Sequence, residues 1–198
     1  MRRWIKAGLA LLIACLSIPA FAQLTGSEGE KFLEAVKARD NATAVPMLAE
    51  PGRLVDYRGY DGDTALHIAT RNRDLSWVGF LLSKGADPNI GDKIGDTALI
   101  IAARMGFEDA GEYLLRYKAS VDATNRRGET ALIVAVQQRQ PRMVEMLLKA
   151  GASPDKADHA AGYTARDYAK RDNRNPQLLR LIETVKSTKK KVAGPGIN

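Results

Sequence analysis

A five-residue sequence recurs along this chain at a nearly constant interval. Gly62–Leu66 reads GDTAL, Gly95–Leu99 repeats it unchanged, and Gly128–Leu132 reads GETAL, so successive copies begin 33 residues apart. A weaker copy, GYTAR, begins at Gly162 after 34 residues, and the extra residue among 159–161 predicts one longer turn. Self-similarity with a period of about 20 to 50 residues is typical of solenoids, in which each unit packs only on its neighbours.

Two further landmarks recur in phase with this sequence. An apolar pair follows each copy, and a Gly-Ala or Lys-Ala step follows the first three pairs. Agreement of three separate landmarks on one period is hard to obtain by chance, so the repeat decides the architecture before local propensity is considered. The pairs are Leu81-Leu82, Leu114-Leu115, Leu147-Leu148 and Leu181-Ile182, and the steps begin at Gly85, Lys118 and Gly151.

Each unit is predicted to form two short helices and a turn. Thr97 can cap a first helix whose inward side carries Leu99 and Ala102, and Pro141 suits the first position of a second helix. One such pair cannot bury its own apolar face, whereas stacked pairs can. The predicted domain spans 23–187, with an N-terminal cap at 28–60, repeats at 61–93, 94–126 and 127–160, and a C-terminal cap at 161–187.

Two segments of the chain resemble signatures of the ankyrin repeat family. Thr64–Ala69 reads TALHIA against the family's TPLHxA, and Leu81–Asn89 reads LLSKGADPN against LLxxGADxN. The resemblance implies an all-α solenoid of about five helix-turn-helix repeats, caps included, joined by β-hairpin-like turns. It also implies that His67 bonds to the Thr64 hydroxyl and to backbone of the neighbouring turn.

The first 22 residues have the pattern of a secretory signal peptide. Three cations in residues 1–6 precede an apolar run, and Ala20-Phe21-Ala22 forms a small-x-small cleavage site. The apolar run is too short for a stable membrane span. We therefore expect cleavage after Ala22 and a periplasmic or secreted product, with a lipid anchor at Cys15 as the less favoured alternative. Cleavage removes the only cysteine, which excludes disulfides and thiol chemistry from the mature chain.

The net charge of +7 is concentrated at the two ends of the chain. The leader contributes three positive charges and the segment after Ile182 contributes a further three, which leaves only +1 for the body. Nucleic-acid binding is therefore not expected, because the positive charge is not spread over a folded surface that could follow a phosphate backbone. Residues 188–198 are charged and contain Gly and Pro, which predicts a disordered basic tail.

No arrangement of residues indicates catalysis or a cofactor. His67 and His159 stand three repeats apart, and no spacing of His, Cys and carboxylates indicates a metal site. Asp61 and Asp63 flank a turn glycine, where Asp is favoured for bonding to local backbone, so turn chemistry explains them better than an acid–base pair or a calcium site. The sequence predicts a protein that is not an enzyme and that uses neither metal nor cofactor.

The remaining candidate for function is a binding surface. The resemblance implies that the hairpin tips and the exposed sides of the first helices form a concave face that binds a protein partner. Tyr, Arg and Met are residue types that supply binding hot spots, although solubility explains any single Arg equally well. Ile94 and Met105 are apolar, and solubility does not explain an apolar side chain in such an exposed position. The predicted partner-binding residues are Tyr60, Asp61, Asp63, Lys93, Ile94, Asp96, Arg126, Arg127, Glu129, His159 and Tyr163 at the tips, and Arg71, Asn72, Arg104, Met105, Gln137, Gln138 and Arg171 on the first helices.

A second hypothesis assigns the same face to a different ligand. A stripe of arginines could hold an anionic small molecule or polymer of the envelope. Moderate salt should abolish such binding, whereas a contact anchored by Tyr, Met and Ile should persist. Neither hypothesis involves nucleic acid or a membrane span, and the chain is predicted to be a monomer. The stripe comprises Arg71, Arg104, Arg126, Arg127 and Arg171.

Overall fold

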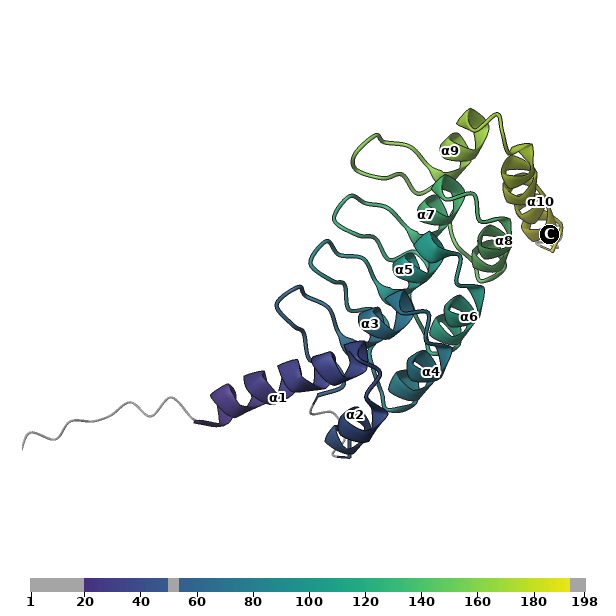
Figure 1. Cartoon of the computed structure of the whole chain (residues 1–198). Coiled ribbons are helices and arrows are strands. Elements are labelled where there is room, and N and C mark those ends of the chain that lie inside the picture. The colour runs from purple at the N-terminus through teal and green to yellow at the C-terminus, as the bar shows by residue number, and fades with distance from the viewer. Residues whose placement is uncertain (1–19, 50–53, 193–198) are drawn as a thin grey trace, which may run out of the picture.

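The computed structural model describes residues 20–49 and 54–192, with side chains described over 28–49 and 54–184. Ten helices lie in this part of the chain and form two rows (Figure 1). The inner row, from which the hairpins project, comprises α1 (Ala20–Lys37), α3 (Ala65–Arg71), α5 (Ala98–Met105), α7 (Ala131–Gln137) and α9 (Ala165–Arg171). The outer row comprises α2 (Asn41–Met47), α4 (Leu75–Ser83), α6 (Glu108–Arg116), α8 (Pro141–Lys149) and α10 (Pro176–Val192).

Each helix packs against its partner in the same repeat and against helices of the adjacent repeats. Along the inner row α1 contacts α3, α3 contacts α5, α5 contacts α7 and α7 contacts α9. Along the outer row α4 contacts α6, α6 contacts α8 and α8 contacts α10. None of the extensive helix contacts in the described part skips a repeat. The structure is therefore the all-α repeat solenoid that the sequence predicted.

The core is a continuous apolar layer between the two rows. Leu81, Leu114 and Leu147 occupy equivalent positions in successive repeats, and each is 0% exposed. Ala102 and Ala135 of the inner helices are also 0% exposed, and their small side chains let one inner helix approach the next closely. The stack thus supplies the apolar cover that one helix pair lacks.

The inner helices begin where the threonines of the repeated sequence predict. The hydroxyl oxygens of Thr97, Thr130 and Thr164 each accept from the backbone N–H three residues further on, at 3.4, 3.2 and 3.1 Å. These bonds satisfy amides that have no partner inside the helix. Pro141 is the first residue of α8, as predicted.

The glycine of the repeated sequence is required in the hairpins for two reasons. Gly95 has a φ of +83°, and a Cβ placed on it would lie 2.9 Å from the backbone nitrogen of Arg126 in the next hairpin. Any other residue would therefore meet both backbone strain and a steric clash. The last hairpin closes between Ala157 and Thr164 rather than over the shorter span Thr124–Thr130, so it is longer by one residue, as predicted.

The first and last described helices, α1 and α10, overlap the predicted leader and tail. α1 begins at Ala20, so the predicted cleavage point lies in its first turn, and the rest of the leader, including Cys15, lies outside the described residues. α10 continues to Val192 and so overlaps the first residues of the tail that was predicted from residue 188. Adding turns to an existing helix requires no new nucleation, which favours this continuation. The described helices include none that is long and apolar enough to cross a bilayer.

Candidate functional site

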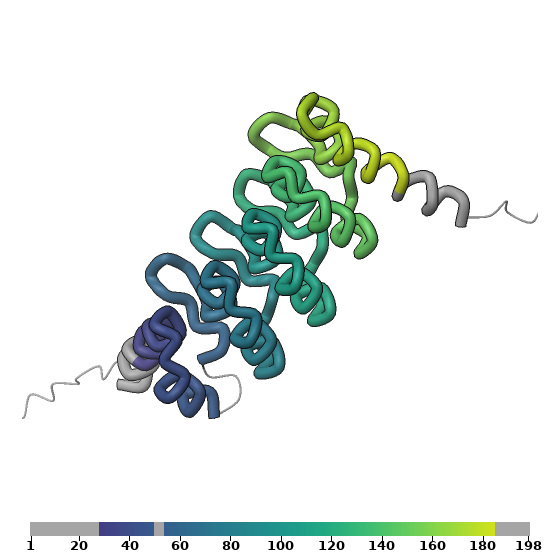
Figure 2. Tube along the Cα trace, turned by 45° about the vertical axis from the view of Figure 1, so that its right-hand side comes forward, coloured from purple at the N-terminus to yellow at the C-terminus, as the bar shows by residue number. Residues whose placement is uncertain are grey.

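The hairpins and the exposed sides of α3, α5, α7 and α9 form one side of the stack, which we call the hairpin face (Figures 1 and 2). Backbone bonds join successive tips. The Arg126 N–H donates to the Ile94 carbonyl at 3.0 Å, and the His159 N–H donates to the Arg127 carbonyl at 2.7 Å. The tips of the last three hairpins are therefore parts of one hydrogen-bonded surface rather than independent loops.

Two apolar side chains project from the tips into solvent. Tyr60 is 92% exposed and Ile94 is 55% exposed, which makes them the most exposed large apolar side chains in the described part of the chain. Both were predicted to contact a partner. The predicted tip residues Asp61, Lys93, Arg126, Arg127 and His159 are also exposed.

Inside each of the last three hairpins, one side chain holds the tip in shape. The Asp92 Oδ1 accepts from the N–H groups of Ile94 and Asp96, both at 2.9 Å. The Asn125 Oδ1 accepts from the N–H groups of Arg127 and Glu129, at 2.9 and 3.0 Å. Asp158, at the equivalent position, accepts from Ala161 and Gly162. Sequence reasoning missed these three residues, although their 33-residue spacing was a usable signal.

Two residues predicted to contact a partner are buried instead. Asp96 is 2% exposed and Glu129 is 6% exposed. The Asn125 Nδ2 donates to the Asp96 Oδ1 and the Glu129 Oε2, both at 2.8 Å. Asp96 and Glu129 therefore do not lie exposed at the tips as expected, because both carboxylates turn inward to accept from this amide and from arginines.

The arginine stripe of the second hypothesis is largely neutralised by carboxylates. Arg71 pairs with Asp63 and Asp92, each at 2.5 Å. Arg104 pairs with Asp96 at 2.7 Å, and Arg127 pairs with Glu129 at 2.7 Å. Such pairs leave little net charge for a free anion at those positions.

The last arginine of the stripe and Tyr163 interact with each other. The guanidinium carbon of Arg171 lies 4.6 Å from the centroid of the half-buried Tyr163 ring, and its Nη1 donates to the Tyr163 hydroxyl at 2.7 Å. Both were predicted to contact a partner, and the structure brings them together at the base of the last hairpin.

His67 connects the start of α3 to the next hairpin. Its Nδ1 accepts from the Thr64 N–H at 3.0 Å and lies 2.9 Å from the Thr64 hydroxyl. Its Nε2 lies 3.0 and 3.1 Å from the carbonyl oxygens of Ile90 and Asp96, so the neutral ring carries its proton on Nε2. Burial lowers the pKa of His67, against the opposing effect of nearby carboxylates. These bonds match the role that the family resemblance implied.

The inner helices end in positions that are partly covered. Asn72 and Met105 are half-buried, and their carbonyl oxygens each accept from an arginine of the preceding repeat. Gln138 is exposed, whereas Gln137 is half-buried and lines a groove between α7 and α9.

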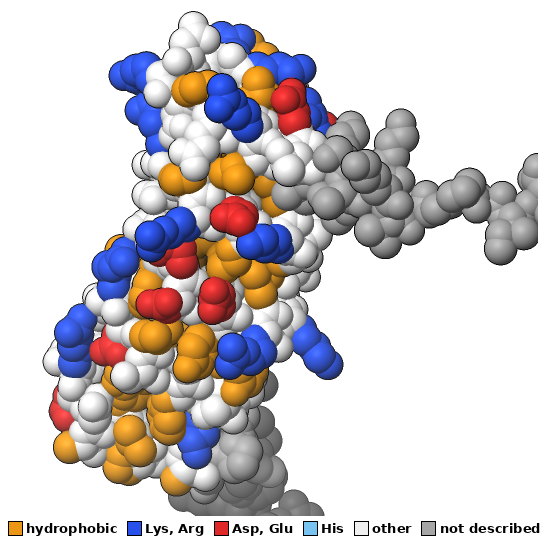
Figure 3. Space-filling model, turned by 90° about the vertical axis from the view of Figure 1, so that its right-hand side faces the viewer, with side chains coloured by type: hydrophobic (Ala, Val, Ile, Leu, Met, Phe, Trp, Pro, Cys, Tyr) orange, Lys and Arg blue, Asp and Glu red, His pale blue; other side chains and the backbone are white. Residues whose placement is uncertain are grey.

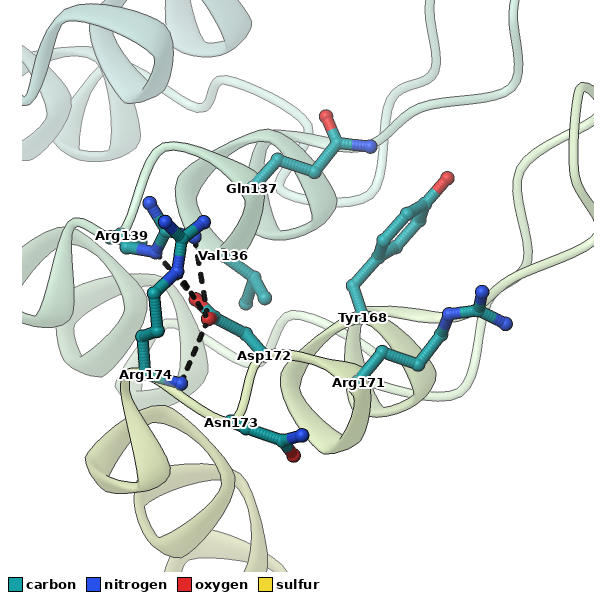
Figure 4. Close-up of a pocket in the computed structure, with 8 residues that line it drawn as sticks. All are labelled: Val136, Gln137, Arg139, Tyr168, Arg171, Asp172, Asn173 and Arg174. Carbon is teal, nitrogen blue, oxygen red and sulfur yellow. Dashed lines mark hydrogen bonds and ion pairs between the residues drawn. The ribbon is translucent and has the colours of Figure 1, made fainter.

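This groove has a volume of about 470 Å³ (Figure 4). Asp172 lies at its centre and accepts from the Nε of Arg139 at 2.6 Å, and the Arg174 N–H donates to it at 3.2 Å. The hydrogen bond from Arg139 holds the pKa of Asp172 below its usual value. The lining residues are Val136, Gln137, Arg139, Tyr168, Arg171, Asp172, Asn173 and Arg174.

Sequence reasoning found only Gln137 and Arg171 of this groove. The loop that follows α9 spans Asp172–Asn175, one residue longer than Gln138–Gln140 after α7. That insertion was visible as a change of phase before Pro176, but its effect on the spacing of the helices depends on packing.

The opposite side of the stack, formed by the outer helices, mixes charged and apolar side chains (Figure 3). Its exposed large apolar residues include Val45 at 44% and Tyr117 at 41%. Over the described ranges, no three His, Cys, Asp or Glu side chains come together as a metal site would require.

Comparison with known proteins places this architecture in a family. Residues 76–158 match a family model described as ankyrin repeats (3 copies), and residues 48–102 match one described as ankyrin repeats (many copies). The chain is 36% identical over 85 residues to a mitochondrial disaggregase of Homo sapiens, and 37% identical over 89 residues to that of Bos taurus. These matches cover 43% and 44% of this chain but only 12% and 13% of the relatives.

Proposed function

Because this chain belongs to the ankyrin repeat family, we propose that it binds a protein partner through the hairpin face and catalyses no reaction of its own. Ankyrin repeats generally mediate protein–protein interaction. The matched part of each disaggregase is a small fraction of that protein, so similarity to it supports the repeat architecture and not its activity.

One observation carries this proposal, namely the exposure of Tyr60 and Ile94 on the tips of neighbouring hairpins. Neither side chain is needed to cover the core, and a solvated turn gains nothing from an apolar side chain. Aromatic and large apolar residues in an exposed, fixed position can act as anchors in an interface.

The rigidity of the second and third tips, around Ile94 and Arg126, also favours binding. Asp92 and Asn125 each fix a tip by accepting from two backbone N–H groups, and bonds between the tips join them to one another. A surface that is already ordered loses little conformational entropy when a partner binds. A modest number of anchors can therefore give specific binding.

Affinity capture from a cell-envelope extract tests this function when it is done with matched variants. The double variant Tyr60→Ala/Ile94→Ala removes both apolar tips, and Tyr117→Ala removes a comparable exposed ring from the outer-helix side. We expect the double variant to lose at least tenfold of the captured partner, while Tyr117→Ala retains it. Equal loss in both, or in neither, would assign binding to another surface.

The extract is chosen because we also propose that residues 1–22 direct export to the bacterial periplasm. Mass spectrometry of the protein isolated from the envelope should find Gln23 as its first residue. A product that begins at a lipid-modified Cys15 would contradict cleavage after Ala22 and support membrane anchoring.

A further inference from the structure

We propose that the groove between α7 and α9 binds an acidic segment of the partner protein, an inference that rests on the function proposed above. The groove lies at the C-terminal end of the hairpin face, where Gln137 and Arg171 were predicted to contact a partner. Three guanidinium groups line it against a single carboxylate, so its lining carries a net positive charge.

The guanidinium groups of Arg139 and Arg174 retain capacity for a ligand. Arg139 uses its Nε and Nη2 for Asp172, at 2.6 and 3.3 Å. The Nε of Arg174 lies 3.9 Å from the Asp172 carboxylate, too far for a hydrogen bond, and the Arg174 side chain is 79% exposed. The two Nη groups of Arg174 can therefore bind a carboxylate in the bidentate geometry that guanidinium groups favour.

The remaining lining fits a polypeptide better than a free inorganic anion. The half-buried Tyr168 ring provides apolar surface above the buried Val136, and Gln137 and Asn173 provide amides that can pair with a peptide backbone (Figure 4). A small anion would use the arginines alone. A peptide that carries Glu or Asp can use both parts of the groove.

The opposite end of the hairpin face has the reverse charge. A smaller depression of about 160 Å³ beside α1 is lined by four carboxylates and one lysine, and its charge stays negative when Arg71, which pairs with Asp63, is counted as well. An acidic segment is repelled there and attracted at the α7–α9 groove, so its position along the stack is defined. The charged residues at this end are Glu30, Glu34, Asp61, Asp63 and Lys37.

Titration of the ¹⁵N-labelled protein with a hexaglutamate peptide, followed by NMR, tests the proposal. We expect saturable shifts of the backbone amides of Arg139, Asp172 and Arg174, and none at Glu34 or Asp61. Shifts centred on Glu34 or Asp61, or on the outer helices, would overturn the assignment. So would equal shifts of the same amides with inorganic phosphate, because the groove would then be a site for a free anion.

A matched pair of variants separates the groove from general charge. Arg174→Glu reverses a charge in the groove, and Arg180→Glu makes the same change at an exposed residue of α10 outside it. We expect Arg174→Glu to weaken hexaglutamate binding at least tenfold and Arg180→Glu to change it less than twofold. Equal weakening would mean that only net charge matters. If hexaglutamate fails to bind while partner capture still depends on Tyr60 and Ile94, the proposed function stands and the groove assignment fails.

Discussion

The helical half and the hairpin half of each repeat are stabilised by different interactions. Between the rows of helices, Leu114 and Leu147 are fully buried among apolar side chains. In the hairpins, Asn125 and Asp92 bond to backbone, while buried carboxylates pair with arginines. The helical half stabilises the stack through apolar area, whereas the hairpin half maintains a shape that polar groups specify. The binding surface can therefore vary at its tips while the core remains unchanged.

The largest expected effect comes from the helical half. Leu114→Ala leaves a cavity in a fully buried site and should lower the free energy of unfolding by about 2 to 5 kcal/mol. Urea denaturation followed by circular dichroism measures the change. Ile94→Ala, on a tip, should change stability by about 0.5 kcal/mol or less. Similar losses in both variants would break the distinction between the two halves.

A smaller loss is expected from the polar network of the hairpins. Asn125→Ala removes the amide that bonds to the buried Asp96 and Glu129, and it should lower the free energy of unfolding by about 1 to 3 kcal/mol. The neighbouring Arg126→Ala alters only an exposed side chain and serves as the control in the same denaturation experiment. A loss for Asn125→Ala no greater than that for Arg126→Ala would show that the network does not stabilise the fold.

His67 links the two halves and should give stability a dependence on pH. Its pKa is lowered in the folded state, so as pH falls below about 6.5 the unfolded chain takes up a proton first. The free energy of unfolding should therefore decrease with falling pH, by about 1.4 kcal/mol per pH unit at most, until the folded His67 also becomes protonated.

Matched variants separate this contribution from that of other groups. His67→Gln should remove this pH dependence of the free energy of unfolding between about pH 6.5 and 5. Ordinary carboxylates are still charged over this range, so the histidine is the group that it isolates. His159→Gln, at an exposed tip, should leave the slope in place. Thermal unfolding at several pH values measures both, and a slope that survives His67→Gln would assign the titration to another residue.

The smallest effect is expected at the loops that join inner and outer helices. Arg73 has a φ of +53°, donates to the Met105 carbonyl at 2.8 Å and lies over the Phe107 ring, whereas Gly106 occupies the equivalent place one repeat later. Arg73→Gly relieves backbone strain and loses these contacts, so the net change should stay within about 0.5 kcal/mol.

A second substitution at this position sharpens the test. Arg73→Ala loses the same contacts and keeps the strained backbone, so it should be less stable than Arg73→Gly by about 1 kcal/mol. Denaturant midpoints of the two variants give the comparison. An Arg73→Ala variant as stable as Arg73→Gly would show that backbone strain is negligible at this loop.

Sequence reasoning predicted the fold well because its signals are local and repeated. The threonine caps, Pro141 and the phase of the leucine pairs each act within one repeat, and the structure confirms them. It predicted the exposure of Tyr60 and Ile94 for the same reason. It did not reveal that Asp96 and Glu129 are buried, because the direction of a carboxylate at a hairpin depends on partners elsewhere in the stack.

The groove between α7 and α9 could not be predicted from the sequence for the same reason, because it depends on contacts between repeats. Arg139 and Asp172 stand 33 residues apart, and they meet only because adjacent repeats stack. The longer loop after α9 was visible in the sequence, yet the space that it opens depends on how α10 packs on α8 and α9.

By itself, the sequence determined the period, the helix pairs and the apolar phase, since each follows from the spacing of residues along one chain. Only the tertiary structure decided which charged groups face solvent and which are paired. Ion pairs such as Arg104 with Asp96 and Arg139 with Asp172 depend on distances in space. Electrostatic energy falls with distance through space and does not follow separation along the chain. The distribution of free and paired charges on the hairpin face is therefore set only when the repeats stack.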